Sequence, residues 1–125
     1  MPEVKLEVMH GIIFINNIST ENITIPEYIP EKLVSATNTC ISVATQAYVD
    51  GYVEIKLTNN FKNDSLNKVF QGMIETPDNE IGVFTSEDIC ILHINTLEDK
   101  TQINIWADDL MNPSKVVIET INTRS

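Results

Sequence analysis

The chain has 125 residues, 42% of them hydrophobic, and its 18 acidic and 8 basic side chains give a formal net charge of -10. This length suits a single domain, residues 1–125, that buries roughly two thirds of its unfolded surface. No apolar run approaches the roughly 20 residues of a membrane span, and the acid excess argues against direct nucleic-acid binding, which needs clustered lysine and arginine.

The N-terminal segment and the two cysteines both bear on the cellular compartment. Acidic residues come early in the chain, and no apolar segment of the signal-peptide type follows them. Cys40 and Cys90 each stand in a strand-like pattern beside apolar neighbours, which favours two reduced, buried thiols over one disulfide. We therefore expect a cytoplasmic protein that does not insert into membranes.

The chain begins with a predicted strand in which Val4, Leu6 and Val8 alternate with polar residues. Gly11 interrupts this pattern before the apolar residues 12–15, so the strand either bulges or turns at the glycine. The following residues are typical of a loop.

One short α-helix is predicted near residues 30–37. Pro30 can occupy the first helical turn, where its missing N–H is not needed, and Glu31 suits the helix N-terminus. Ile29 and Leu33 recur at nearly helical spacing. Since about two turns are too few to be stable alone, the helix is expected to dock on a sheet.

The stretch from Cys40 to Leu57 has the clearest period in the chain, because its apolar residues fall on odd numbers and polar residues stand between them. A hairpin with a three-residue loop of Val49, Asp50 and Gly51 would keep every odd residue on one face. One long strand bent at Gly51 is the alternative, and glycine suits both.

The second half of the chain reads as short strands separated by polar turns. The expected strands lie in residues 68–76, 80–85, 89–94, 101–107 and 115–121, and the nearly continuous apolar run at 89–94 suits a strand covered on both faces or one in the middle of a sheet. Together with the first half this gives about six to nine strands, so the predicted fold is mainly all-β, an antiparallel β-sandwich or jelly roll with one short helix.

The sequence contains no recognised catalytic or metal-binding motif. His10 and His93 stand apart, and no Cys, His or carboxylate group has metal-ligand spacing, so we predict no metal, no cofactor and no enzyme activity. His93 is expected to be a hydrogen-bonded residue of the core or of a sheet edge. The acidic pairs at 87–88, 98–99 and 108–109 are expected to be solvated loop charge, of which at least two pairs could share one end of the sandwich.

Two groups of residues are candidates for a protein-contact surface. Tyrosine is enriched at interfaces, and acids complement lysine and arginine on a partner. The first group flanks the proposed turn and the second surrounds the lone tryptophan; the alternative for the tyrosines is that they pack under a neighbouring loop. The candidate residues are Tyr48, Asp50, Tyr52, Glu54, Trp106, Asp108 and Asp109.

Several segments resemble the competence protein J family, small cytosolic inhibitors of a bacterial DNA-entry nuclease. They are the opening KLEVMHGIIFI, the PEKLVSAT segment leading into ISVATQAYVDGYVEIKL, and the stretch from NEIGVF to INIWADD with its lone Trp106. The resemblance spans most of the chain. It implies a compact β-rich protein that binds a nuclease and blocks DNA hydrolysis without catalysis of its own.

The expected function is therefore intracellular inhibition of a nuclease, an immunity- or competence-type role in a bacterium. The net negative charge agrees, because a nuclease that grips phosphate presents a basic face that an acidic protein can meet; charge that serves solubility alone is the other account. A small-ligand or carbohydrate-binding jelly roll, and a structural sandwich with an oligomeric role, are the alternatives.

Overall fold

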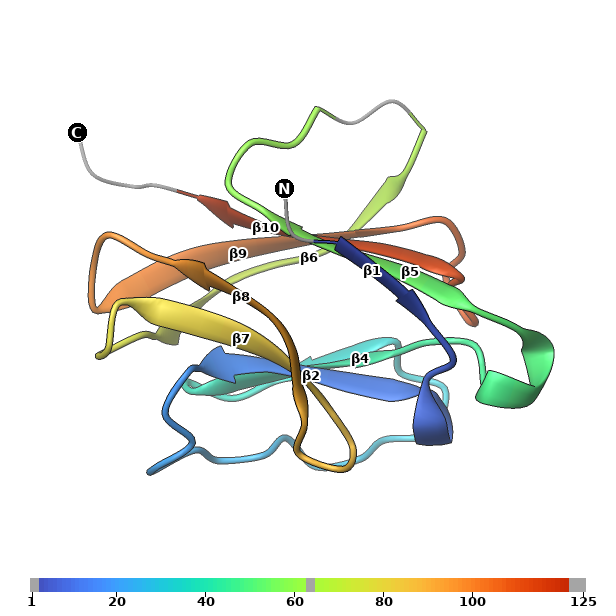
Figure 1. Ribbon diagram of the computed structural model, residues 1–125, viewed down its shortest axis with the longest axis horizontal. Helices are drawn as coiled ribbons and strands as arrows, with labels where there is room; N and C mark the ends of the chain where they lie inside the picture. Colours follow the sequence, from blue (N-terminus) through green and yellow to red (C-terminus); the bar gives the residue numbers. More distant parts are fainter. Residues whose placement is uncertain (1–2, 63–64, 122–125) are drawn as a thin grey trace.

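The computed structural model describes residues 3–62 and 65–121, with all of their side chains except those of Met9 and Tyr48. Two five-stranded sheets face each other across one core, and two short 3-10 turns join them (Figure 1). The elements are β1 (Glu3–Leu6), η1 (Met9–Gly11), β2 (Ile12–Asn17), β3 (Val34–Ala36), β4 (Cys40–Ala44), η2 (Tyr48–Asp50), β5 (Val53–Thr58), β6 (Asn67–Glu75), β7 (Glu80–Thr85), β8 (Cys90–Asn95), β9 (Lys100–Ala107) and β10 (Lys115–Ile121).

The strand order is β1-β5-β10-β9-β6 in the first sheet, which we call sheet A, and β3-β4-β2-β7-β8 in the second, sheet B. Neighbouring strands pair antiparallel except β5 and β10, which are parallel. The predicted mainly-β fold is thus confirmed. Within the described residues, no helix is both long enough and apolar enough to cross a membrane.

Alternating apolar side chains from both sheets form the core. Strands whose every second residue is apolar can bury one face against a second sheet, as in a sandwich. The fully buried β-branched and leucine side chains include Ile13, Ile15, Ile41, Val43, Val53, Ile55, Leu57, Ile103, Ile105 and Ile118.

The predicted helix near residues 30–37 is wrong. The chain makes a turn at Pro30 and Glu31, and then Val34–Ala36 form strand β3, which pairs antiparallel with β4. Glu31 has a positive φ of 69°, which interrupts a right-handed helix. Helical spacing over two turns is a weak signal, and pairing with β4 buries Val34 where an isolated helical turn would gain little.

The predicted hairpin within Cys40–Leu57 is also wrong, and so is its alternative of one bent strand. β4 belongs to sheet B and β5 to sheet A, so the intervening residues cross from one sheet to the other through η2. The odd-numbered residues of both strands are nevertheless fully buried. Because the two strands face one core from opposite sides, a single alternation continues through the crossover.

Gly11 likewise marks a crossover. β1 lies in sheet A and β2 in sheet B, and η1 connects them with positive φ values at His10 (61°) and Gly11 (60°). A turn at the glycine was one of the two expectations. At residues 89–94 the expectation of a strand covered on both faces is wrong, because β8 is an edge strand of sheet B with exposed residues at both ends.

The cysteines and His93 differ in part from expectation. Both cysteines are free; Cys40 is buried, whereas Cys90 is exposed because it begins the edge strand. His93, also on β8, is exposed and its Nδ1 lies 2.8 Å from Glu80 Oε2. It is a hydrogen-bonded residue of the sheet edge, one of the two places expected.

Candidate protein-binding surface

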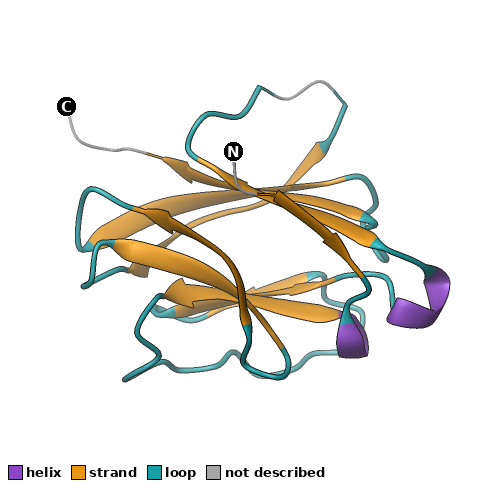
Figure 2. Cartoon of the chain, viewed as in Figure 1, coloured by secondary structure: helices purple, strands orange, loops and turns teal. Residues whose placement is uncertain are grey.

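Both crossovers lie at the same end of the sandwich, where Figure 2 shows the two 3-10 turns. We call this end the turn end, and define it by residues 9–11, 28–33, 45–52 and 108–114. The first and third segments link the sheets, the second leads into β3, and the fourth joins β9 to β10.

Backbone hydrogen bonds hold the four segments of the turn end together. The N–H of Thr45 donates to the carbonyl of Gly11 (2.8 Å), the N–H of Gln46 to that of Pro113 (3.0 Å), and the N–H of Ala44 to that of Leu33 (2.8 Å). A Cβ atom on Gly11 would come within 3.0 Å of the Thr45 carbonyl oxygen, so glycine permits the close approach. The turn end is therefore a built surface in which each segment fixes its neighbour.

A cavity of about 530 Å³ opens between these segments. Tyr28, Ile29 and Met111 line it and are 75%, 44% and 58% exposed. Val49, Tyr52 and Leu110 are further exposed apolar or aromatic side chains on the same segments. Grouped apolar side chains left in contact with water mark interaction sites more often than single ones do.

Acidic side chains accompany the apolar ones. Asp50 and Glu31 line the cavity, together with the basic residues Lys32 and His10. Asp109 Oδ2 accepts hydrogen bonds from the N–H groups of Met111 (2.9 Å) and Asn112 (2.7 Å). These bonds, first that from Asn112 and then that from Met111, lower the pKa of Asp109 from its usual value, so its carboxylate stays ionised.

Asp108 shapes the same loop from its first residue. Its Oδ1 accepts from the N–H groups of Ser114 (3.0 Å) and Lys115 (3.1 Å), and its Oδ2 accepts from the hydroxyl of Ser114 (2.7 Å). The two adjacent carboxylates thus bind the backbone of their own loop. They position Met111 and Pro113 in addition to carrying charge.

The structure brings five of the seven predicted contact residues to the turn end. Asp50, Tyr52, Asp108 and Asp109 lie there, and the backbone of Tyr48 is in η2, although its side chain lies outside the described residues. The carbonyl of Tyr52 accepts a hydrogen bond from Gln46 Nε2 (2.8 Å), which ties the end of the crossover to its start.

The other two predicted contact residues lie on sheet A. Glu54 on β5 is in register with Lys5 of β1 on one side and Lys115 of β10 on the other. Cross-strand neighbours of opposite charge stabilise a sheet and neutralise each other's field. Glu54 is thus placed among lysines and apart from the acidic cavity.

Trp106 on β9 packs against side chains of sheet A and of the β5–β6 connection. Its ring centroid lies 5.5 Å from that of Phe61, and Lys68 Nζ lies 5.5 Å from the indole ring. Its Nε1–H donates to Glu119 Oε1 (3.2 Å). Trp106 is not a lining residue of four of the cavities in the described part of the chain.

Charge is divided unevenly between sheet A and the rest of the chain. The strands of sheet A carry five lysines against four acids, so most of the acid excess belongs to sheet B and the loops. These sheet A residues are Lys5, Lys56, Lys68, Lys100, Lys115, Glu3, Glu54, Glu75 and Glu119. The acids outside sheet A lie at both ends of the sandwich: Asp50 and Asp109 belong to the turn end, whereas Glu98 and Asp99 belong to the β8–β9 connection at the opposite end.

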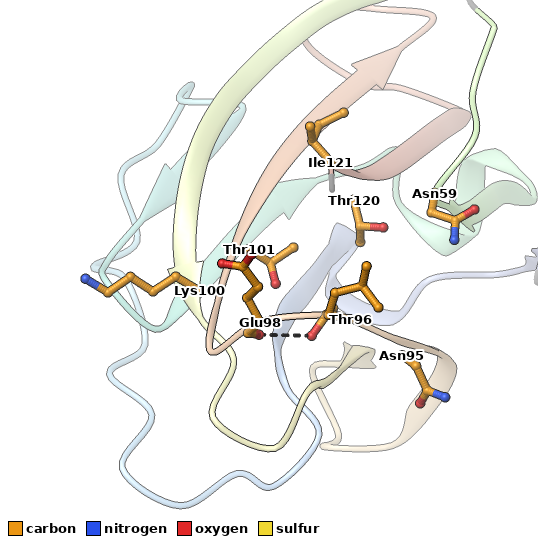
Figure 3. Close-up of a pocket in the computed structure, with 9 residues that line it drawn as sticks. Asn59, Asn95, Thr96, Glu98, Lys100, Thr101, Thr120 and Ile121 are labelled. Atoms are coloured by element: carbon orange, nitrogen blue, oxygen red, sulfur yellow. Dashed lines mark hydrogen bonds between the residues drawn. The ribbon is translucent and has the colours of Figure 1, made fainter. Parts of the chain in front are cut away.

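A second cavity, of about 120 Å³, is lined by residues of the β8–β9 connection and of the end of β10 (Figure 3). Three of its nine lining residues are threonines, and the hydroxyl of Thr96 donates to the carbonyl of Glu98 (3.4 Å). Since small-molecule sites measure about 300 to 1,000 Å³, this cavity is too small for one. In the described part of the chain, no three His, Cys, Asp or Glu side chains group as metal ligands.

The apolar members of the turn end were not among the predicted contact residues. Tyr28 and Ile29 stand between two prolines, and Leu110 and Met111 follow two aspartates in a loop. Large apolar residues in segments that break every strand pattern are a signal in themselves, because a loop that packs nowhere does not need them.

The fold is a two-sheet β-sandwich in which the chain crosses between the sheets at both ends, and two solved structures share it. One is described as "Crystal structure of ComJ, inhibitor of the DNA degrading activity of NucA, from Bacillus subtilis". It matches this chain with a TM-score of 0.71 and 15% identity, over 98% of this chain and 96% of its own. A structure described as "Crocagin biosynthetic gene J" matches with a TM-score of 0.51 and 9% identity, over 99% of this chain and all of the other.

Comparison by sequence adds no relative to these two. No protein-family model matches the chain, and neither does any curated protein. At identities of 15% and 9%, the likeness establishes a common fold. The chain has the ComJ-like fold.

Proposed function

We propose that this protein is an inhibitor of a nuclease, which it binds without catalysing a reaction itself. The observation that carries the proposal is the match to the ComJ structure along nearly the full length of both chains. A fold alone does not fix a function, so the chemistry of the surface has to agree with it.

Surface chemistry supports a basic protein partner. A nuclease must bind the phosphates of DNA, and lysine and arginine supply that binding. A formal charge of -10 attracts such an enzyme over distance, and at the turn end acids lie beside exposed apolar side chains. By the same argument we propose that the protein does not bind DNA itself.

The proposal extends to where and when the protein acts. An inhibitor of this kind would protect the DNA of the cell that makes it, so we propose a bacterial cytoplasmic protein of the competence or immunity type. Both cysteines are free thiols, as suits a reducing compartment.

A DNA-protection assay tests the proposal. Linear DNA is digested by NucA, and separately by any nuclease whose gene lies beside that of this chain, with increasing amounts of the purified protein. With at least one of the two nucleases, we expect the DNA to remain intact once the inhibitor is equimolar with the enzyme. Heat-denatured protein of the same charge is the control, because it keeps the acids but loses the surface. Digestion unaffected by the native protein with both enzymes would rule the function out.

A further inference from the structure

We infer that the turn end is the surface that binds the nuclease, and that its occupant is the enzyme's basic, phosphate-binding face, with one side chain of that face filling the cavity of about 530 Å³. This inference rests on the proposed function and adds where contact is made.

The apolar side chains supply an anchor site. Interfaces draw most of their energy from a few residues that fill well-formed pockets near the centre, where water is excluded. Ile29 and Met111 line the cavity from different segments and are both substantially exposed, so a partner side chain inserted between them would remove apolar surface on both walls from water.

The acids determine which partner fits. Asp50 and Glu31 share the cavity with these apolar residues, and Asp109 holds an ionised carboxylate in the adjoining loop. Arginine or lysine on the partner would find its apolar stem matched by Ile29 and Met111 and its charge by the carboxylates. An acidic or purely apolar partner side chain would lack the attraction to the carboxylates.

Rigidity also favours this end of the molecule. The hydrogen bonds from Thr45 to Gly11 and from Gln46 to Pro113 are made in the unbound protein, so the three segments that they join need little rearrangement on binding. A surface that is already ordered loses less entropy when its partner docks.

The outer face of sheet A is a poorer choice. Glu54 is flanked by Lys5 and Lys115, and Lys68 lies over Trp106. A basic partner would meet these lysines there, and like charges across an interface cost affinity.

Two matched pairs of variants test the inference. Met111→Lys places a positive charge beside the cavity, and Met73→Lys makes the same change at a methionine that is 50% exposed on β6 of sheet A. Asp50→Lys reverses a charge in the cavity, and Asp99→Lys does so at an exposed position in the β8–β9 connection. Circular dichroism and the melting temperature check that each variant folds.

We expect Met111→Lys and Asp50→Lys to raise the inhibition constant for the nuclease at least ten-fold, and the two controls to change it less than two-fold. If Met111→Lys is misfolded, Met111→Ala takes its place, with an expected rise of at least three-fold. If the wild type inhibits and the controls weaken inhibition as much as the turn-end variants do, the surface lies elsewhere and the proposed function stands. If the wild type does not inhibit, both proposals fail.

Discussion

The backbone N–H of Gln46 donates a hydrogen bond to the carbonyl oxygen of Pro113 over 3.0 Å. This bond joins the crossover between the two sheets to the loop between β9 and β10, segments that are more than sixty residues apart in the chain. The bond brings together the segments that carry Asp50 and Met111, and both of these residues line the same cavity. Whatever disorders the β9–β10 loop should therefore disturb that surface.

Replacing Asp108 tests the order of this loop. Asp108→Ala removes the acceptor for two backbone N–H groups and the Ser114 hydroxyl, and should lower the free energy of unfolding by about 1 kcal/mol. Asp99 lies in an exposed loop, and its backbone carbonyl, which the substitution keeps, accepts the hydrogen bond from the N–H of Thr76. Asp99→Ala should therefore lower the free energy of unfolding by less than half as much. Urea unfolding at pH 7 measures both, and equal values would show that the Asp108 carboxylate does not organise the loop.

The buried thiol of Cys40 predicts a loss of stability in alkali. Burial raises the pKa of Cys40 from 9.0 to about 12, so the folded state keeps the thiol protonated where the unfolded state loses its proton. Its contribution is fully present below pH 9 and is lost as the pH rises toward 12. Urea unfolding at a series of pH values should show this decline, and Cys40→Ala should flatten it.

The second cysteine provides the comparison for that experiment. Cys90 is exposed at the start of β8, so Cys90→Ala should leave most of the alkaline decline in place. In the native protein at pH 8, a thiol reagent should modify Cys90 well before Cys40. Equal rates at the two thiols would contradict the burial of Cys40.

Trp106 should matter for stability more than for inhibition. Trp106→Ala removes an indole that contacts Phe61, Lys68 and Glu119, and truncation of a half-buried tryptophan should cost roughly 2 to 3 kcal/mol. Trp106→Phe keeps most of the packing and should leave the inhibition constant within two-fold. A ten-fold loss of inhibition by a folded Trp106→Phe variant would move the binding surface to sheet A.

Association with the nuclease should depend strongly on salt. Acids grouped at the turn end attract a basic enzyme before contact, and salt screens this attraction over about 10 Å at 0.1 M ionic strength. The association rate constant should fall at least ten-fold between low and high salt, with a smaller change in the dissociation rate constant. Asp50→Lys should reduce the slope, whereas an association rate independent of salt would argue against electrostatic steering.

The strands could be predicted from the sequence because burial on one face imposes a period of two. Ile41, Val43, Val53, Ile55 and Leu57 are all buried, as their alternation indicates. Their division between two sheets could not be predicted, since strands that face one core from either side show the same alternation as a hairpin. An alternation of apolar and polar residues shows which side chains of a strand face the core. It does not show which other strand the first one pairs with through hydrogen bonds.

The short helix was mispredicted for a related reason. Pro30, Glu31 and the spacing of Ile29 and Leu33 are local signals, whereas strand β3 depends on its partner β4, which follows it in the sequence. Burial of Val34 in the strand stabilises the fold by more than the weak local preference for a helix does. The acids and tyrosines of the turn end could be singled out by residue type, but their grouping with Tyr28 and Met111 depends on which loops the topology brings together.

The most direct test of the account is a titration of the nuclease with the wild-type protein in which complex formation and DNA hydrolysis are followed in the same samples. The account predicts one saturable curve, with hydrolysis lost in proportion to the enzyme bound and an inhibition constant equal to the dissociation constant. Binding that leaves hydrolysis intact, or no binding at all, would contradict it.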